Sequence, residues 1–246
     1  MVKFSKWRIA AEKAGPIDNL VKNWVGSYHG VSFLIEAKAG GGRGRKTIRL
    51  GIEKFNNDIL ALRTHHFFDK KIAPGDAFDQ FDQHSFFSTI RFENTLIGAE
   101  RITETSEISV FEKWLSGKIC MPKGKDIYEI SRTAIRSEWR GKALYNILTM
   151  FSIEYLKKYR NAKKINFIID IHNNLYLHKW IQKIGSEKYG HPCECHDFPC
   201  EPLLVQAYTF NVKDDKNSNL CQEQSDRIAN VINNKMDYTV ISNYEK

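Results

Sequence analysis

The sequence lacks several features that would assign it to a specialised class of protein. No apolar run approaches the roughly 20 residues that a membrane-spanning helix requires. Cysteine is scarce, with five residues in 246, and this odd number in a chain of this length argues against a disulfide-built scaffold. The basic first residues are not followed by an apolar segment and a small-residue cleavage site, so no secretory signal is expected. These absences favour a cytoplasmic protein in a reducing compartment, without a transmembrane segment.

The composition that remains is that of a soluble globular protein, with 42% hydrophobic and 27% charged residues. The length allows one large domain with extensions and a substantial buried core. The formal net charge of +8 favours acidic partners, which include nucleic acid, anionic lipid headgroups and an acidic carrier protein. Charge alone does not choose among these partners, because most of it is expected to lie on a solvated surface.

We divide the chain into three parts. Residues 1–50 are an N-terminal extension, with a helix predicted from Pro16 and a hairpin of two strands near 31–37 and 47–52. The glycine-rich segment 40–45 is predicted to be the hairpin loop. An RNA-binding Gly/Arg segment is the alternative, but such segments are normally longer repeats, so no nucleic acid is expected. Residues 51–212 form the main domain, and residues 213–246 form a polar C-terminal helix and tail.

Periodicity predicts an alternation of helices and strands in the main domain. A helix is predicted between Ile52 and Phe68, and a polar loop follows it. A strand over 86–92 turns at Glu93 and Asn94 and returns over 95–102. Further along, the sequence predicts an apolar strand over 164–171, a short helix over 175–184 and a last strand over 202–210.

The stretch from Asp126 to Arg160 organises this domain. Its residues 127–135 alternate as in a half-buried strand, and residues 144–159 have apolar side chains at helical spacing. A strand that passes through a small, basic turn into a helix can bind an anion, because the free N–H groups and the positive end of the helix dipole face the turn. A pyrophosphate or a phosphopantetheine arm suits such a site. The alternative is an ordinary strand-turn-helix with a solvated basic turn.

This stretch resembles motif A of the GNAT acyltransferases, in which Arg-Gly-x-Gly-x-Gly/Ala after a strand cradles the phosphates of an acyl carrier. The chain has Ala143 and Tyr145 where that family has small residues, usually glycine. The resemblance implies an α/β GNAT-like fold, with a mixed, splayed central sheet flanked by helices. It implies an acyl donor, either acyl-ACP (an acidic acyl carrier protein) or acyl-CoA, bound by seven residues: Thr133, Ala134, Ile135, Arg140, Gly141, Lys142 and Ala143.

Further short motifs, in the same order along the chain, resemble those of the acyl-homoserine-lactone (autoinducer) synthases and the N-acyl amino acid synthases. They are Arg63 with Phe67, Asp79-x-x-Asp82, Gly98-x-x-Arg101 and Glu129-Ile-Ser131-Arg132. The resemblance implies that Arg101, Glu129 and Arg132 converge on the acceptor or on one another. The resemblance also implies that Asp79 and Asp82 organise a loop over the acceptor. About fifty residues precede the helix that carries Arg63 and Phe67, and the tryptophan that autoinducer synthases carry after Phe67 has no counterpart, so the amino-acid-acylating branch is favoured.

Transfer of an acyl group to nitrogen requires a neutral amine and donors for the oxyanion that forms on attack. Burial beside an acyl chain would raise the pKa of Glu129, which suits a base that takes a proton from an ammonium group. Arg132 lies three positions further on and shares a face with Glu129 only if the strand contains a bulge. The oxyanion donor is expected to be a backbone N–H near Ser131 to Ala134.

Each of these assignments has a structural alternative. Glu129 with Arg101 or Arg132 could be a structural ion pair, Asp79 and Asp82 could cap a turn, and Arg63 could be a surface helix residue.

Four residues near the C-terminal end of the domain, Cys193, Cys195, His196 and Cys200, could in principle ligate zinc. Their spacing contains no C-x-x-C pair, so we expect no metal and interpret residues 191–200 as a thiol-rich loop beside the acyl pocket.

The function predicted from these features is N-acyl transfer, in which a fatty acyl group moves from a thioester carrier to the amine of an amino acid or a derivative. The small-molecule amine is the acceptor, and the basic surface suits an acidic acyl carrier protein. An acyl-homoserine-lactone synthase that uses S-adenosylmethionine is the alternative among enzymes. An inactive GNAT scaffold that binds nucleic acid or lipid is the alternative of another class.

Overall fold

The computed structural model describes residues 32–38, 45–68, 78–92, 94–106, 109–140, 144–172, 174–195, 203–217, 219–221, 223–224 and 238–243. For residues 32–38, 45–49, 67–68 and 238–243 it describes the backbone only. The helix predicted from Pro16 and most of the glycine-rich segment 40–45 lie outside the described residues.

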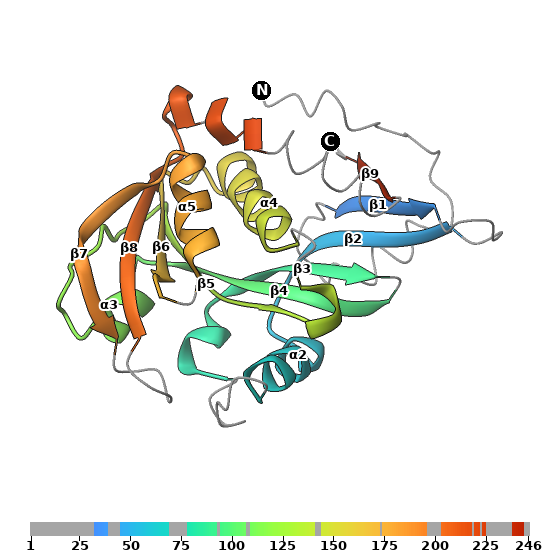
Figure 1. Ribbon diagram of the computed structural model, residues 1–246, viewed down its shortest axis with the longest axis horizontal. Coiled ribbons are helices and arrows are strands. Elements are labelled where there is room, and N and C mark those ends of the chain that lie inside the picture. The colour runs from blue at the N-terminus through green and yellow to red at the C-terminus, as the bar shows by residue number, and fades with distance from the viewer. Residues whose placement is uncertain are drawn as a thin grey trace.

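In this part of the chain, nine strands form one sheet in the order β7-β8-β6-β5-β4-β3-β2-β1-β9 (Figure 1). The strands are β1 (Ser32–Lys38), β2 (Arg45–Glu53), β3 (Phe86–Phe92), β4 (Thr95–Glu104), β5 (Ile127–Ile135), β6 (Lys164–Asp170), β7 (Glu187–Cys195), β8 (Leu203–Asn211) and β9 (Tyr238–Asn243). Only β5 and β6 are parallel among the described pairs, and the other neighbours are antiparallel. The sheet is therefore mixed, with its one parallel pair near the middle.

The parallel pair opens along its length. The described register between β5 and β6 runs only from Ile127 opposite Lys164 to Ile130 opposite Phe167. Beyond these residues the two strands continue without further pairing in the described structure, so the sheet splays apart at the middle of β5. A splay of this kind gives a ligand access to the edge of β5, because its backbone groups there are not used by β6.

Helices cover both faces of the sheet (Figure 1). Two of them, α4 (Leu144–Tyr159) and α5 (Leu175–Lys183), lie on one face. The opposite face carries α2 (Asn57–Phe68), the 3-10 turn η2 (Gln80–Gln83) and the short α3 (Val110–Trp114). A second 3-10 turn, η3 (Ser137–Trp139), links β5 to the segment before α4.

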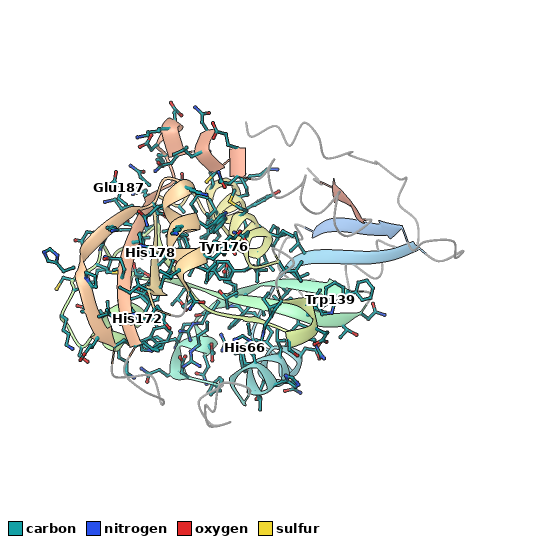
Figure 2. The ribbon with its side chains drawn as sticks, viewed as in Figure 1. His66, Trp139, His172, Tyr176, His178 and Glu187 are labelled. Carbon is teal, nitrogen blue, oxygen red and sulfur yellow. The ribbon has the colours of Figure 1, made fainter. Side chains whose placement is uncertain are left out.

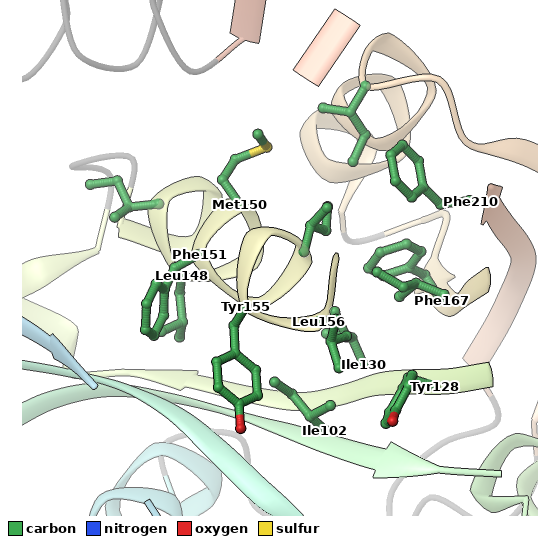
Figure 3. Packing of buried hydrophobic residues seen from close by; sticks show 14 of the residues in the cluster. Ile102, Tyr128, Ile130, Leu148, Met150, Phe151, Tyr155, Leu156, Phe167 and Phe210 are labelled. Atoms are coloured by element: carbon green, nitrogen blue, oxygen red, sulfur yellow. The ribbon is translucent and has the colours of Figure 1, made fainter. Parts of the chain in front are cut away.

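The larger hydrophobic core lies under α4 and α5 (Figure 3). The apolar stripe of α4, which includes Leu148, Phe151 and Leu156, packs on Ile102 and Ile130 of the sheet. This is the helical spacing that the sequence predicted, and full burial of each such side chain contributes about 1.5–3 kcal/mol. The core thereby fixes α4 against β4 and β5, the strands that carry most of the charged motifs.

Two smaller clusters hold the elements of the opposite face. One joins Ile59 and Leu62 of α2 to Phe87, Leu96, Ala99 and Ala134 of the sheet. The other joins Phe81 of η2 and most of α3 to Val205, Ala207 and Cys195. The two elements of this face that carry charged motifs, α2 with Arg63 and η2 with Asp82, are therefore each held in place by a separate apolar cluster.

The structure confirms the predicted strands over 86–92, 95–102, 127–135 and 164–171 and the predicted helices 144–159 and 175–184. Two predictions were wrong. Residues 191–195 are not a loop, because β7 continues to Cys195 and pairs with β8. The helix predicted from Ile52 begins only at Asn57, because β2 continues to Glu53 and pairs with β3. The helix α3 and the strand β9, which pairs with β1, were not predicted. Within the described residues, no helix combines the length and the hydropathy needed to cross a membrane.

Candidate functional site

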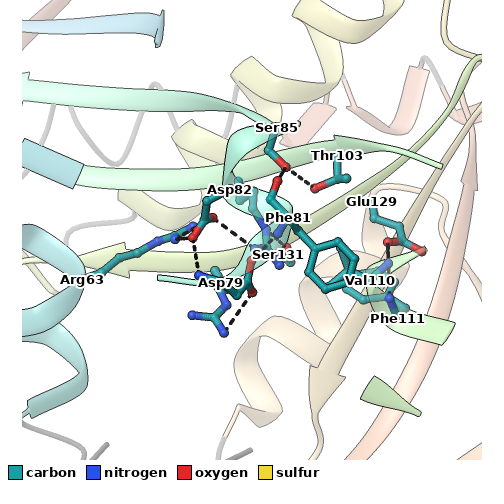
Figure 4. Close-up of polar contacts among 12 residues, drawn as sticks. Arg63, Asp79, Phe81, Asp82, Ser85, Thr103, Val110, Phe111, Glu129 and Ser131 are labelled. Carbon is teal, nitrogen blue, oxygen red and sulfur yellow. Dashed lines mark hydrogen bonds and ion pairs between the residues drawn. The ribbon is translucent and has the colours of Figure 1, made fainter. Parts of the chain in front are cut away.

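A buried cluster of arginines and aspartates lies between α2, η2 and β4 (Figure 4). Nη1 of Arg63 lies 2.8 Å from Oδ1 and 2.9 Å from Oδ2 of Asp82, and both side chains are fully buried. Nη1 of Arg101 donates to Oδ1 of Asp79 at 2.6 Å and to Oδ1 of Asp82 at 3.1 Å. Arg63 is therefore not a surface helix residue, and four of the residues singled out in the sequence form one network.

The two aspartates also fold their own turn. Asp79 accepts a hydrogen bond from the N–H of Phe81, and Asp82 accepts one from the N–H of Asp79, which together form a capping box around η2. Their capping role and their ion pairs thus coexist, and the turn holds both carboxylates toward the arginines. Removal of either aspartate would disturb the backbone as well as the charge.

Burial and charge act in opposite directions on these groups. Burial lowers the pKa of Arg63 to about 10, although Asp82 opposes the shift. Burial alone would raise the pKa of Asp79, but the charges of Arg101 and Arg132 hold it below its ordinary value. Asp79 therefore stays ionised at neutral pH and keeps its negative charge beside Arg101 and Arg132.

A β-bulge brings Arg132 into the same cluster. Ala99 pairs with Ala134 and Arg101 pairs with Ser131, so two residues of β5, Arg132 and Thr133, lie opposite one residue of β4. Arg132 has a φ of +50°, a left-handed conformation that is strained for a residue with a Cβ. Its Nη2 lies 3.1 Å from Oδ2 of Asp79.

The bulge changes the direction of the side chains that follow it in β5. A bulge was the condition under which Arg132 was predicted to lie on the same face as Glu129. Ser131, just before the bulge, accepts a hydrogen bond from Nε of Arg101 at 3.1 Å. Trp114 of α3 lies against both arginines, with its ring centroid 5.5 Å from the guanidinium carbon of Arg101 and 5.6 Å from that of Arg132. The unpredicted helix α3 thus supplies a wall of the site.

Glu129 lies beside this cluster and contacts the start of α3 (Figure 4). Its carboxylate accepts hydrogen bonds from the hydroxyl of Ser109 at 2.6 Å and from the N–H groups of Val110 and Phe111 at 2.7 and 3.3 Å. Burial raises the pKa of Glu129, while these three donors and the charge of Arg101 oppose the rise. Among the described residues it has no ion pair within 4 Å, so the structural ion pair with Arg101 or Arg132 is not formed.

The residues assigned to the acyl donor have different surroundings. Thr133 turns its hydroxyl to the opposite face of the sheet, where it donates to Oε2 of Glu100 at 2.9 Å. Ala134 is buried in the cluster beneath α2. The carbonyl of Ile135 accepts a hydrogen bond from Nε of Arg140 at 3.1 Å. Of the predicted set, Gly141, Lys142 and Ala143 lie outside the described residues.

Arg140 is also held by a histidine that the sequence analysis did not assign to the site. Its Nη2 lies 3.0 Å from Nδ1 of His66, and this ring nitrogen also lies 3.2 Å from the carbonyl oxygen of Ile135. Figure 2 labels His66 on α2 and Trp139 on η3, the 3-10 turn that ends next to Arg140. The turn before α4 is thereby tied to the last turn of α2, where Phe67 lies with its side chain outside the described atoms.

The cysteine-rich segment is only partly described. Cys195 is buried and lies 3.2 Å from the carbonyl oxygen of Trp114, and Cys193 is half-buried in the same strand. No group of three or more metal-ligating side chains is found among the described residues, and His196 and Cys200 lie outside them.

Glu100 is the main buried polar residue that the sequence analysis missed. It follows Ala99 on β4 and is completely buried, with hydroxyl donors from both β5 and α4. The only sequence signal was a second charged residue directly before Arg101, after the apolar first half of the strand.

A mixed sheet that splays at its parallel pair, with helices on both faces, is the fold of the GNAT-like acyltransferases, as the sequence predicted. Several solved structures with this fold are acyl-homoserine lactone synthases. The chain is similar to BjaI, a CoA-dependent acyl-homoserine lactone synthase with MTA, at a TM-score of 0.52 and 17% identity over 70% of this chain and 80% of that one.

It is similar to the CoA-dependent synthase MesI (TM-score 0.51, 15% identity, 67% of this chain and 84% of that one) and to the AHL synthase LasI (TM-score 0.52, 16% identity, 73% and 95%). Identities of this size show a shared fold. Neither the protein-family models nor the curated protein sequences give a match.

Proposed function

We propose that this protein is an N-acyltransferase that moves a fatty acyl group from a thioester carrier to the amine of an amino acid or a derivative. The observation that carries the proposal is the meeting of three features at the middle of β5. There the strand parts from β6, the bulge at Arg132 and Thr133 interrupts the ladder, and the arginine-aspartate cluster begins.

The donor side of the proposal rests on the splay. A thioester arm that enters between β5 and β6 meets backbone N–H groups of β5 that β6 does not use, and such groups stabilise an oxyanion. One solved neighbour, BjaI, carries SAM and isopentyl-CoA, which supports a thioester donor for a chain of this fold. We propose acyl-ACP or acyl-CoA, and the net charge of +8 favours the acidic carrier protein.

The acceptor side rests on the arginine-aspartate cluster. Nη2 of Arg101 is buried and has no hydrogen-bond acceptor among the described residues. A carboxylate of the acceptor would satisfy this donor, and the negative charge of Asp79, whose side chain is 19% exposed, would attract its ammonium group. An amino acid carries both groups, which supports this class of acceptor.

Glu129 is the proposed base. Its pKa is raised by burial, so its carboxylate is a better proton acceptor than an exposed one. It takes a proton from the acceptor ammonium, directly or through a water molecule, and the neutral amine attacks the thioester carbonyl. The C–N bond forms, and the nitrogen then gives up its second proton as the C–S bond breaks. The carrier thiolate takes up this second proton and leaves as a thiol, and Glu129 returns the first proton to solvent.

The experiment is a product assay. The purified protein is incubated with a palmitoyl-loaded acyl carrier protein or palmitoyl-CoA and a mixture of amino acids, and the organic extract is analysed by mass spectrometry. An N-acyl amino acid supports the proposal, and the preferred carrier is the one that is consumed faster. If neither thioester is consumed above the rate without protein, the chain is not an acyltransferase of this kind.

The lactone synthase is the second candidate, because the similar structures are acyl-homoserine lactone synthases and one contains SAM. The same assay with S-adenosylmethionine decides between them, since a lactone synthase releases an acyl-homoserine lactone and methylthioadenosine. The inactive scaffold is distinguished by binding: nucleic acid or anionic vesicles would bind while both thioesters remained intact.

A further inference from the structure

A buried carboxyl group, that of Glu100, joins the bulge of β5 to α4 on the face of the sheet away from the proposed acceptor site. The side chain is completely buried. Thr133 of the bulge donates to Oε2 at 2.9 Å, and Thr149 of α4 donates to the same oxygen at 2.8 Å. Glu100 is also the β4 residue that the bulge faces, because Arg132 and Thr133 lie opposite it.

The other oxygen has a partner that suits a protonated carboxyl. Oγ of Ser152 lies 2.8 Å from Oε1 of Glu100 and 3.0 Å from the carbonyl oxygen of Leu148, and Ser88 lies 2.7 Å from the same hydroxyl. A serine hydroxyl has one proton and two lone pairs. Ser152 can therefore donate to Leu148 while it accepts from Ser88 and from a protonated Oε1.

In this arrangement every polar atom of the group is satisfied, and no charge is buried. The ionised form keeps three hydroxyl donors, but no cation lies within 4 Å of it among the described residues. The titratable group that faces it is Tyr145 of α4, whose pKa is raised by burial and by the charge of Glu100, so the phenol stays neutral. The groups from β3 and β5 that surround Glu100 are the uncharged Ser88 and Thr133.

We propose that Glu100 is a positioning residue, which as a neutral carboxyl holds the bulge of β5 against α4 and loosens it on ionisation. We call the hydrogen bonds from Thr133 and Thr149 to Glu100 the tie between β5 and α4. The bulge sets the left-handed conformation of Arg132 and its contact with Asp79, so a change in the tie is transmitted to the acceptor site through the backbone of β5. Burial raises the pKa of Glu100 to about 7, which brings the transition close to neutral pH. The inference rests on the proposed acyl transfer for its catalytic consequence but not for its structural one.

The structural consequence is measured without any substrate. Hydrogen exchange of the segment 131–135 is followed at pH 6 and pH 9 and expressed as protection factors, which remove the intrinsic pH dependence of exchange. The wild-type protection is expected to fall about tenfold at the higher pH, the size of one hydrogen bond or one buried charge. In Glu100→Gln, a neutral isostere, it is expected to stay high at both values, and in Glu100→Ala it is expected to be low at both.

Thr133→Val cuts the same tie from the strand side and is expected to behave like Glu100→Ala. Equal protection of the wild-type segment at pH 6 and pH 9 would overturn the inference, and so would a Glu100→Gln variant as poorly protected as Glu100→Ala. The wild-type measurement decides even if a variant does not fold.

The catalytic consequence is read from the alkaline side of the pH profile. In the wild type kcat is expected to fall above neutral pH while the KM for the amine stays constant, and Glu100→Gln is expected to lose this fall. A pH-dependent bulge without any acyl transfer would refute the proposed function and leave the tie intact. Acyl transfer whose alkaline fall persists in Glu100→Gln would refute the tie and leave the function intact.

Discussion

Glu100 and Arg101 are consecutive residues of β4, and their side chains serve opposite faces of the sheet. Glu100 accepts hydrogen bonds from Thr149 and Ser152 of α4, whereas Arg101 pairs with Asp79 and Asp82 beside α2. Both are completely buried. Because successive residues of a strand point to opposite sides, one peptide unit links the helix that follows the proposed donor turn to the cluster proposed for the acceptor.

The first prediction concerns the charge cluster. Asp82→Asn removes the carboxylate that pairs with Arg63 and Arg101 and leaves both guanidinium groups buried, so it is expected to lower the free energy of unfolding by about 3–5 kcal/mol. Urea unfolding followed by circular dichroism measures this loss. Lys123→Met, which breaks the exposed pair with Glu112, is the control and is expected to change nothing measurable. A loss no larger than that of the control would show that the cluster is not needed for stability.

The second prediction concerns the backbone of the bulge. Arg132→Ala and Arg132→Gly both remove the ion pair with Asp79, but only glycine adopts a φ of +50° without strain. The glycine variant is therefore expected to be about 1 kcal/mol more stable than the alanine variant. Thermal unfolding of the two proteins under identical conditions makes the comparison. An alanine variant as stable as the glycine variant would mean that the residue at 132 is not held in this conformation.

The third prediction follows from the pKa of Glu100. A carboxyl group whose pKa rises from 4.5 to about 7 on folding favours the folded state fully below pH 4.5, and this contribution is lost as the pH rises through about 7. The loss corresponds to about 3 kcal/mol in the free energy of unfolding. Denaturation at pH 5 and pH 8 is expected to show this loss in the wild type and not in Glu100→Gln. An equal change in both proteins would assign the pH dependence to other groups.

The fourth prediction concerns Glu129 as the base. Glu129→Gln is expected to lower kcat for acyl transfer by at least about 100-fold, the usual contribution of a positioned base. Since the carboxyl must be ionised to accept a proton, wild-type activity is expected to fall as the pH drops through its raised pKa. Initial rates measured between pH 5 and pH 9 give this fall in activity, the acid limb of the pH profile.

Ser109→Ala is the matched variant for this prediction. The serine hydroxyl donates to the carboxylate and opposes the rise of its pKa, so its removal is expected to move the acid limb to higher pH without abolishing activity. An acid limb that stays in place in Ser109→Ala, together with full activity in Glu129→Gln, would transfer the role of base to another group.

Much of the main domain could be read from the sequence because its signals are local. The alternation of residues 127–135 and the apolar spacing of 144–159 are properties of single elements, and burial of one face fixes them. The short helix α3 has five residues, too few for a periodic pattern, and β9 is defined by its pairing with β1. Strand β7 has mostly exposed side chains and no clear alternation of apolar and polar residues, so its sequence does not indicate that it pairs with β8.

The sequence by itself determined which charged residues accompany which elements: Arg63 in a helix, Asp79 and Asp82 in a turn, Arg101, Glu129 and Arg132 in strands. Only the tertiary structure decided their partners, since the register of β4 and β5 contains a bulge that no local pattern reveals. That one extra residue turns Arg132 toward Asp79 and Thr133 toward Glu100, while the close packing of α3 gives Glu129 its three donors. Partners of buried charges are set by contacts between segments distant in the chain, and such contacts form only when the strands and helices pack together in the folded protein.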